Sequence, residues 1–189
     1  TPIPRTLQTA LLGIRDLSVI ETPPPGRLSI QTFICKFSED IIKEAMLREL
    51  DRGGQVFFLH NNIKSIYSIA SLLKKLVPQS RIAVAHGQMQ ERELESVMVD
   101  FIDQKYDVLV CTTIIDSGLD IASTNTILIN RADRFGLAQL YQLRGRIGRD
   151  KHRAYCYLLI PGLASMTVQA QKRLKAIEEL SELGSGFKL

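Results

Sequence analysis

Short apolar runs alternate with longer amphipathic stretches along most of the chain. The runs are rich in β-branched residues, and several are apolar at consecutive positions, which indicates strands covered by helices on both faces. Alternation of such strands with helices favours βαβ units, so we expect an α/β fold built on an open parallel sheet. The predicted strands are residues 56–60, 82–86, 108–112, 126–129 and 154–160.

The amphipathic stretches between these runs predict the helices. Ser38 can cap the first helix, Glu39 and Asp40 favour the helix dipole in its opening turn, and Gly53 with Gly54 closes it. Further helices are predicted over residues 63–76, 91–102 and 167–183. The last of these is charged and carries its apolar residues on one side, as expected of a helix that packs against a larger body.

The first thirty residues differ in pattern from the rest, and we predict a helix, a short strand and a proline-rich loop there. We therefore expect a linker at residues 1–30, an α/β domain at 31–162 and the start of a helical extension at 163–189. The chain begins abruptly at Thr1 without an initiating Met, so we expect it to be cut from a longer polypeptide.

The composition is that of an ordinary globular protein, with 45% hydrophobic and 23% charged residues in a chain of 189. The net charge of +4 permits nucleic-acid binding without requiring it, because the arrangement of charge matters more than its total. Cys35, Cys111 and Cys156 are odd in number and lie in apolar runs, so we expect reduced, buried thiols of a cytoplasmic protein. No stretch is apolar over the length that a membrane-spanning helix requires.

An arginine-rich run at residues 142–149 is the strongest chemical signal in the sequence. Polar residues here are separated by three, four and three positions, a spacing that places them on one stripe of a helix. They are Gln139, Gln142, Arg146 and Arg149, while Leu140, Leu143 and Ile147 form a separate apolar stripe. We predict a helix that buries its apolar stripe and presents guanidinium groups, whose rigid fork of donors suits phosphate. A solvated basic face is the alternative, since the sequence pI is about 9.0.

A loop with polar residues follows the predicted strand at residues 108–112. Thr112 and Thr113 stand at its carboxyl end, where ligands of open α/β sheets bind, and Gly118 and Asp120 follow in the same loop. Hydroxyls and backbone amides there can hold phosphate, and the Asp120 carboxylate suits a ribose hydroxyl or an arginine. Taken alone, an ordinary strand-to-helix connection is the favoured interpretation of this loop.

His86 and Gly87 stand at the end of another predicted strand. A single histidine in such a place is more often a hydrogen-bonded structural residue than a catalyst. No Cys or second His lies at ligand spacing, so we expect no metal site.

Two motifs of nucleotide hydrolysis are absent from the sequence. It contains no Gly-x-x-x-x-Gly-Lys-Ser/Thr phosphate loop, and no apolar strand ends in the Asp-Glu pair that serves magnesium and water. The arginines therefore look like half of a site. An arginine supplied across an interface can stabilise transition-state charge and accelerate hydrolysis by about a thousandfold or more.

Taken together, these motifs resemble the C-terminal motor lobe of superfamily 2 helicases and translocases. Residues 112–120 resemble motif V, and residues 142–149 resemble motif VI, Gln-x-x-Gly-Arg-x-Gly-Arg. Residues 1–6 resemble the end of motif III, and residues 55–61 lie where motif IV does. The resemblance covers the whole chain and implies a RecA-like domain.

Two bacterial branches of that superfamily share a segment similar to residues 135–140, the RecG-type fork-reversing helicases and the transcription-repair coupling factors. Further segments resemble the coupling factors, namely residues 15–20, 52–56, 86–89, 91–95, 170–177 and 183–187. We therefore favour the coupling-factor branch. A RecG-type lobe and a non-enzymatic nucleic-acid-binding module are the alternatives.

The resemblance implies a role for each motif. Arg146 and Arg149 would be arginine fingers that reach the γ-phosphate of ATP, Gln142 would couple that site to DNA, and Gly118 and Asp120 would face the nucleotide. The residues implied in DNA-backbone contact are Asn61, His86, Gly87, Thr112 and Thr113.

The resemblance also implies partners outside the chain. ATP and its Mg²⁺ would be held by the N-terminal motor lobe of the same polypeptide, and the two lobes together would act on double-stranded DNA as an ATP hydrolase. RNA polymerase and excision-repair proteins would bind through other domains. Residues 163–189 resemble the first arm of the helical hairpin called the translocation motif. The chain alone is expected to hydrolyse no ATP.

Overall fold

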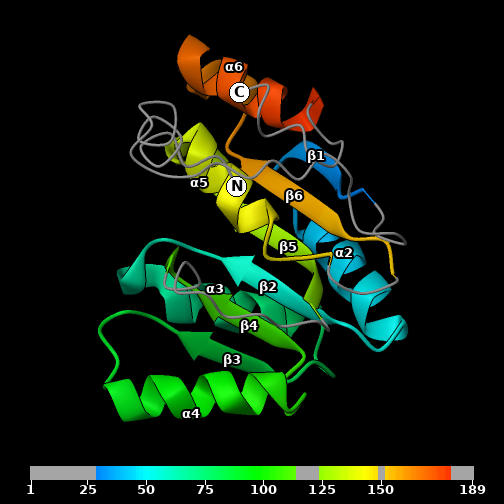
Figure 1. Cartoon of the computed structure of the whole chain (residues 1–189), viewed down its shortest axis with the longest axis vertical. Coiled ribbons are helices and arrows are strands. Elements are labelled where there is room, and N and C mark those ends of the chain that lie inside the picture. The colour runs from blue at the N-terminus through cyan, green and yellow to red at the C-terminus, as the bar shows by residue number, and fades with distance from the viewer. Residues whose placement is uncertain (1–28, 114–123, 149–151, 180–189) are drawn as a thin grey trace, which may run out of the picture.

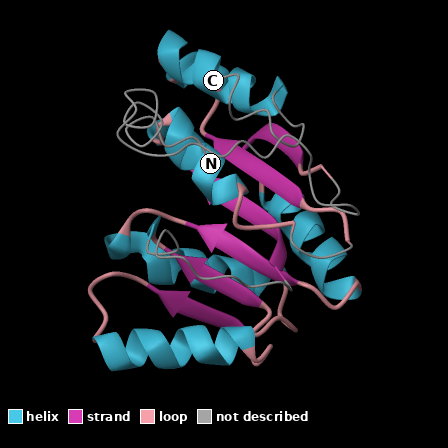
Figure 2. Ribbon diagram, viewed as in Figure 1, coloured by secondary structure: helices cyan, strands magenta, loops and turns pink. Residues whose placement is uncertain are grey.

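The computed structural model describes residues 29–113, 124–148 and 152–179, and within them one six-stranded sheet forms the centre of the molecule (Figures 1 and 2). The strand order is β1-β6-β5-β2-β4-β3, and every neighbouring pair is parallel. The strands are β1 (Gln31–Lys36), β2 (Gln55–Leu59), β3 (Ile82–Ala85), β4 (Val108–Cys111), β5 (Thr124–Asn130) and β6 (Tyr155–Ile160). The α-helices are α2 (Glu39–Asp51), α3 (Ile63–Leu76), α4 (Glu91–Ile102), α5 (Leu137–Arg144) and α6 (Val168–Glu179), with short 3₁₀ turns at η2 (Ala132–Arg134) and η3 (Leu163–Ser165).

Helices cover both faces of the sheet, because successive side chains of each buried strand point to opposite sides. On β2, Val56 and Phe58 pack with α2 and α3, whereas Phe57 and Leu59 pack with α4, α5 and α6. The ring of Phe57 lies 5.5 Å from that of Phe101 on α4, centroid to centroid. The predicted α/β class, with an open parallel sheet between two helical layers, is confirmed.

Two of the helices, α3 and α4, begin and end where the sequence pattern places them. α3 and α4 have the predicted bounds, and α2 follows Ser38 at its N-cap, although the Ser38 side chain makes no capping hydrogen bond. Gly53 has φ +74° and Gly54 donates its N–H to Glu49 O at 3.0 Å, so this glycine pair ends α2 as expected.

The strand at β1 has no counterpart among the predicted strands. Within the described residues it lies at the edge of the sheet and pairs with β6 alone, and polar Gln31, Thr32 and Lys36 at its two ends leave an apolar run of three residues. An edge strand does not need the continuous apolar run that marks a strand buried on both faces, so the criterion that found the central strands missed it.

α6 packs against β1, α5 and η2 at one end of the sheet. Leu174 and Ile177 are buried there, as the apolar side of the predicted helix requires. The helix begins at Val168, one residue later than predicted, and the rest of its predicted length lies outside the described residues. The helix, strand and loop predicted before residue 29 lie outside them too.

The three cysteines are free thiols, but they are not equally buried. Cys111 and Cys156 are buried, whereas Cys35 is only half-buried because it lies on the edge strand β1, so the expectation of three buried thiols is wrong for Cys35. Burial raises the pKa of all three thiols, that of Cys156 to about 12. Among the described helices, none has the length and apolar content to cross a membrane.

Candidate nucleic-acid interface

The carboxyl ends of β2, β4 and β3 lie side by side at one edge of the molecule. These three parallel strands are neighbours in the sheet, and their arrowheads point to the same side in Figure 1. Asn61 follows β2, His86 and Gly87 follow β3, and Thr112 and Thr113 follow β4. The fold therefore brings together the five residues that the resemblance implies in DNA contact, although the segment from Asn61 to Thr113 that contains them is 53 residues long.

Four of these five residues line a shallow groove of about 600 Å³, which we call the strand-end groove. Its lining residues are Asn61, Asn62, Ile63, Lys64, Gly87, Gln88, Thr112, Thr113 and Arg134. Seven of these nine residues carry an amide, a hydroxyl or a cationic group. Such a lining can donate hydrogen bonds to an extended anionic ligand without enclosing it.

Local hydrogen bonds fix the backbone around the strand-end groove. Thr112 donates its N–H to Ala85 O at 3.2 Å, which ties the loop after β4 to β3. The Thr113 hydroxyl lies 3.5 Å from Asn61 Oδ1, and Asn62 caps α3 by accepting the N–H of Lys64 at 3.1 Å. The groove is thus built on the ends of regular elements, which hold its polar groups in place.

His86 directly precedes the groove residue Gly87 and is only 8% exposed. Its Nε2 lies 3.3 Å from the Tyr67 hydroxyl, the two rings meet edge to face with centroids 5.8 Å apart, and the backbone N–H of His86 donates to Met89 Sδ at 3.3 Å. These contacts agree with a hydrogen-bonded structural histidine. Direct contact between His86 and DNA stays a prediction.

A second groove of about 420 Å³ lies beside the first and is called here the β5 groove. Its lining residues are His60, Asn61, Asn62, Thr113, Asn130, Arg131, Arg134, Phe135 and Gln139. The sequence motifs assign no role to four of them, His60, Asn130, Arg131 and Arg134. Their only sequence signal is a position at or shortly after the end of an apolar strand, with His60 directly after β2, Asn130 the last residue of β5, and Arg131 and Arg134 within four residues of it.

Asn130 and Ser65 hold the His60 ring between them. His60 Nδ1 lies 3.0 Å from Asn130 Nδ2, and Nε2 lies 2.8 Å from Ser65 Oγ. The amide nitrogen of Asn130 can only donate, so Nδ1 accepts and Nε2 carries the proton in the neutral ring. Burial lowers the pKa of His60, which favours this neutral form.

The arginine-rich run is not one continuous helix, so the predicted stripe of four polar residues is wrong. α5 ends at Arg144, Gly145 forms its C-cap, and Arg146 lies in the turn beyond, where its N–H bonds Leu143 O at 3.1 Å. Gly148 has φ +76°, a conformation that ends regular helix geometry. Spacing alone could not reveal this end, because the same residue intervals continue across the glycines.

The rest of that run divides between described and undescribed residues. The predicted burial of its apolar stripe is confirmed, with Leu140, Leu143 and Ile147 at most 1% exposed. Gln142 is half-buried on α5, and Arg146 is half-buried beyond it. Arg149, together with Gly118 and Asp120 of the motif V loop, lies outside the described residues.

Arg144 has a structural position that the sequence motifs do not predict. It is 5% exposed, its guanidinium lies 4.5 Å from the centre of the Tyr141 ring, and Nη1 donates to Ile177 O at 2.9 Å. This arginine of the run therefore joins α5 to α6.

Comparison with known families defines the class of this domain. The helicase conserved C-terminal domain model matches residues 38–151, and the chain belongs to that family. Over all 189 residues it is 56% identical to the transcription-repair-coupling factor of Myxococcus xanthus and 57% identical to that of Escherichia coli strain K12. The similarity to the coupling factors expected from the sequence motifs is thus confirmed. The chain spans 16% of the length of each of these relatives.

Solved structures give the same fold. The structure of RecG bound to a three-way DNA junction matches 100% of this chain and 27% of its own length, with a TM-score of 0.77 and 36% identity. Dbp5 of S. cerevisiae, bound to RNA and ADP BeF3, matches 95% of this chain and 46% of its own length, with a TM-score of 0.64 and 17% identity. At that lower identity the likeness supports the RecA-like fold alone.

Proposed function

We propose that the chain is the second motor lobe of an ATP-dependent double-stranded DNA translocase. The full-length protein then displaces stalled RNA polymerase in transcription-coupled nucleotide-excision repair. The observation that supports this most is the strand-end groove, where polar residues from three neighbouring strands meet in a lobe of the helicase C-terminal family. The identity of 56% and 57% to coupling factors, against 36% to RecG, favours the coupling-factor branch.

In this proposal the strand-end groove holds the DNA backbone. Asn61, Thr112 and Thr113 offer amide and hydroxyl groups to phosphate and sugar, and exposed Gly87 lets the backbone approach closely. His86, which directly precedes Gly87, is the fifth residue in contact with the DNA backbone. Contacts of this kind carry no sequence information and weaken with salt, which suits a motor that must move along any duplex.

ATP is the substrate, and the N-terminal lobe of the same polypeptide holds it together with Mg²⁺. Arg146 and Arg149 act as arginine fingers on the γ-phosphate, Gln142 couples that site to DNA, and Gly118 and Asp120 face the nucleotide. Arg146 lies in a turn just beyond α5, a place from which a side chain can reach across an interface more readily than from a packed helix. ATP then closes the two lobes on DNA, and hydrolysis reopens them.

The C-terminal part of the chain transmits this motion. We place a linker at residues 1–30, the RecA-like domain at 31–162 and the first arm of a translocation hairpin at 163–189. The hydrogen bonds from Arg144 to Ile177 O and from Arg173 to Asp133 O, at 2.9 and 3.2 Å, support a firm connection between α6 and the lobe. RNA polymerase and excision-repair proteins bind other domains of this cytoplasmic protein.

The decisive experiment uses the longer polypeptide that carries this chain and RNA polymerase stalled on a labelled duplex by nucleotide deprivation. We expect release of the polymerase with ATP and none with a non-hydrolysable analogue. Reversal of a model replication fork without polymerase release would instead support the RecG-type alternative. Absence of DNA-stimulated ATP hydrolysis would support a non-enzymatic nucleic-acid-binding module.

A further inference from the structure

The strand-end groove and the β5 groove share one wall. Four residues line both grooves, namely Asn61, Asn62, Thr113 and Arg134. Arg134 is the one cation among these four. A ligand that follows either groove therefore passes its guanidinium.

The turn that carries Arg134 is fixed at several points. Arg131 adopts the left-handed conformation with φ +55°, which is unfavourable for a residue with a side chain. The 3₁₀ turn closes through Arg134 N–H to Arg131 O at 3.0 Å, and Arg173 on α6 donates to Asp133 O at 3.2 Å. Buried Ala132 and Phe135 anchor the turn on either side of the exposed arginine. A strained backbone kept in place by its surroundings is a mark of functional sites.

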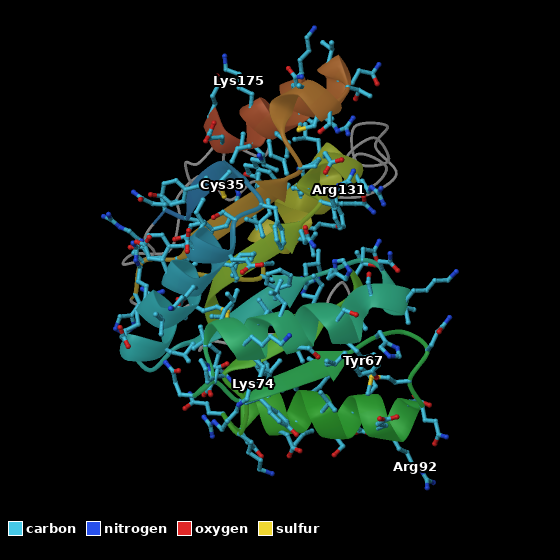
Figure 3. All side chains as sticks on the ribbon, turned by 180° about the vertical axis from the view of Figure 1, so that it is seen from behind. Cys35, Tyr67, Lys74, Arg92, Arg131 and Lys175 are labelled. Atoms are coloured by element: carbon cyan, nitrogen blue, oxygen red, sulfur yellow. The ribbon has the colours of Figure 1, made fainter. Side chains whose placement is uncertain are left out.

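The two arginines of this turn, Arg131 and Arg134, differ in whether a carboxylate pairs with them. Arg131 makes two hydrogen bonds of 2.9 Å to the carboxylate of Asp133, and this pairing lowers the pKa of Asp133. Arg131 is labelled in Figure 3, on the same side of the molecule as Tyr67. Arg134 is exposed, and no hydrogen bond or ion pair of its side chain occurs within the described part of the chain.

The linings of the two grooves are free of negative side chains within the described residues, since neither contains Asp or Glu. The cations of the strand-end groove are Lys64, at the start of α3, and Arg134 at its other wall. Two positive groups in a channel without acidic residues attract a chain of phosphates.

We propose that Arg134 binds a backbone phosphate of the DNA duplex, as a binding residue that no motif of the sequence marks. The inference rests on the proposed function of the strand-end groove. The guanidinium donates two hydrogen bonds to the phosphate oxygens, and Lys64 contacts a neighbouring phosphate as a point charge. Nucleotide phosphate is the other source of this chemistry. DNA is favoured over nucleotide, because Asn61 and Thr113, which share the wall with Arg134, belong to the strand-end groove that we propose for the DNA backbone.

The test replaces Arg134 with Gln in the longer polypeptide that carries both motor lobes. ATP hydrolysis is measured against duplex DNA concentration, at several salt concentrations and under saturating ATP. We expect the DNA concentration for half-maximal stimulation to rise about tenfold, with kcat at saturating DNA and KM for ATP unchanged. The slope of log affinity against log salt should become shallower by about 0.9, the value for one lost phosphate contact. Arg134→Lys should fall between the two proteins.

Arg153→Gln is the matched control. Arg153 is also an exposed arginine, but it stands two residues before β6 and so lies at the amino-end edge of the sheet, away from both grooves. It should leave the DNA and ATP dependences as they are. Asn61→Ala and Thr113→Val test the groove itself.

Each outcome decides a different question. Weaker DNA stimulation by Asn61→Ala and Thr113→Val, with an unchanged Arg134→Gln protein, would overturn the Arg134 inference and leave the proposed function standing. A higher KM for ATP in Arg134→Gln with unchanged DNA dependence would overturn it in favour of nucleotide phosphate. Unchanged DNA dependence in all three variants would show that DNA does not bind in the strand-end groove. This result would overturn both the Arg134 inference and the proposed function of the groove.

Discussion

Arg144 Nη1 donates a hydrogen bond to Ile177 O at 2.9 Å, which joins the last residue of α5 to the C-terminal part of α6. The arginine is buried and its guanidinium lies over the Tyr141 ring. A buried guanidinium that donates to a backbone carbonyl of another helix fixes the two helices relative to each other. The motif VI helix and the helical extension are therefore one packed unit in the described structure.

Replacement of Arg144 by Met should destabilise the chain by about 2 kcal/mol, because a buried carbonyl loses its donor while the side-chain volume is largely kept. The free energy of unfolding in urea measures this loss. Arg153→Met, at an exposed position, should change that free energy by less than about 0.5 kcal/mol. Equal effects of the two substitutions would show that the contact with Ile177 contributes little.

Gly148 and Gly53 share a positive φ but differ in their surroundings. A Cβ on Gly148 would lie 3.1 Å from Ala154 Cβ and 3.2 Å from Ile30 Cγ1, whereas a Cβ on Gly53 would meet nothing within 4 Å. Gly53→Ala should cost about 1 kcal/mol from backbone strain alone, and Gly148→Ala about 2–3 kcal/mol because packing adds to that strain. Urea unfolding of both variants measures the difference. A smaller loss for Gly148→Ala than for Gly53→Ala would contradict this account of the turn after α5.

Protonation of His60 should weaken the fold at mildly acidic pH. The folded-state pKa of His60 lies below its ordinary value of 6.5 because of burial, so the unfolded chain takes up the proton first as pH falls. The stabilising contribution of His60 is complete above pH 6.5 and is lost as pH falls from there through the lowered pKa. Unfolding free energies between pH 7.5 and 5.5 should decline more steeply for the unsubstituted chain than for His60→Gln. Parallel declines would place the pH dependence elsewhere.

The sequence predicts the centre of this fold better than its edges. Continuous apolar runs and helical periodicity identify β2, β4, α3 and α4 because each is held by the hydrophobic core. The end of α5 cannot be predicted in this way, because Gly145 stops the helix while the spacing of polar residues continues. The grooves are harder still. Arg134 reaches the strand-end groove only because a turn after β5 comes close to Asn61 after β2, and no local pattern reports such an approach.

In the longer polypeptide, Arg149→Ala should lower kcat for ATP by about a thousandfold while changing the affinity for ATP far less. An arginine finger stabilises charge that develops in the transition state, so its loss affects turnover more than binding. Steady-state hydrolysis at saturating DNA and a separate nucleotide-binding titration measure the two effects. Arg153→Ala is the control and should retain full turnover. A selective loss of ATP affinity with normal turnover would contradict the finger assignment.

The isolated chain should hydrolyse no ATP, with or without duplex DNA, since its sequence contains neither the phosphate loop nor the Asp-Glu pair. The measurement is phosphate release by the purified chain, with the longer polypeptide as a positive control. The same preparation should still bind duplex DNA weakly through the strand-end groove, with an affinity that falls as salt rises. DNA binding without hydrolysis would separate the two halves of the motor, because the DNA contacts would then reside in this lobe while the phosphate chemistry requires its partner. Measurable turnover by the pure chain would contradict the half-site interpretation of Arg146 and Arg149.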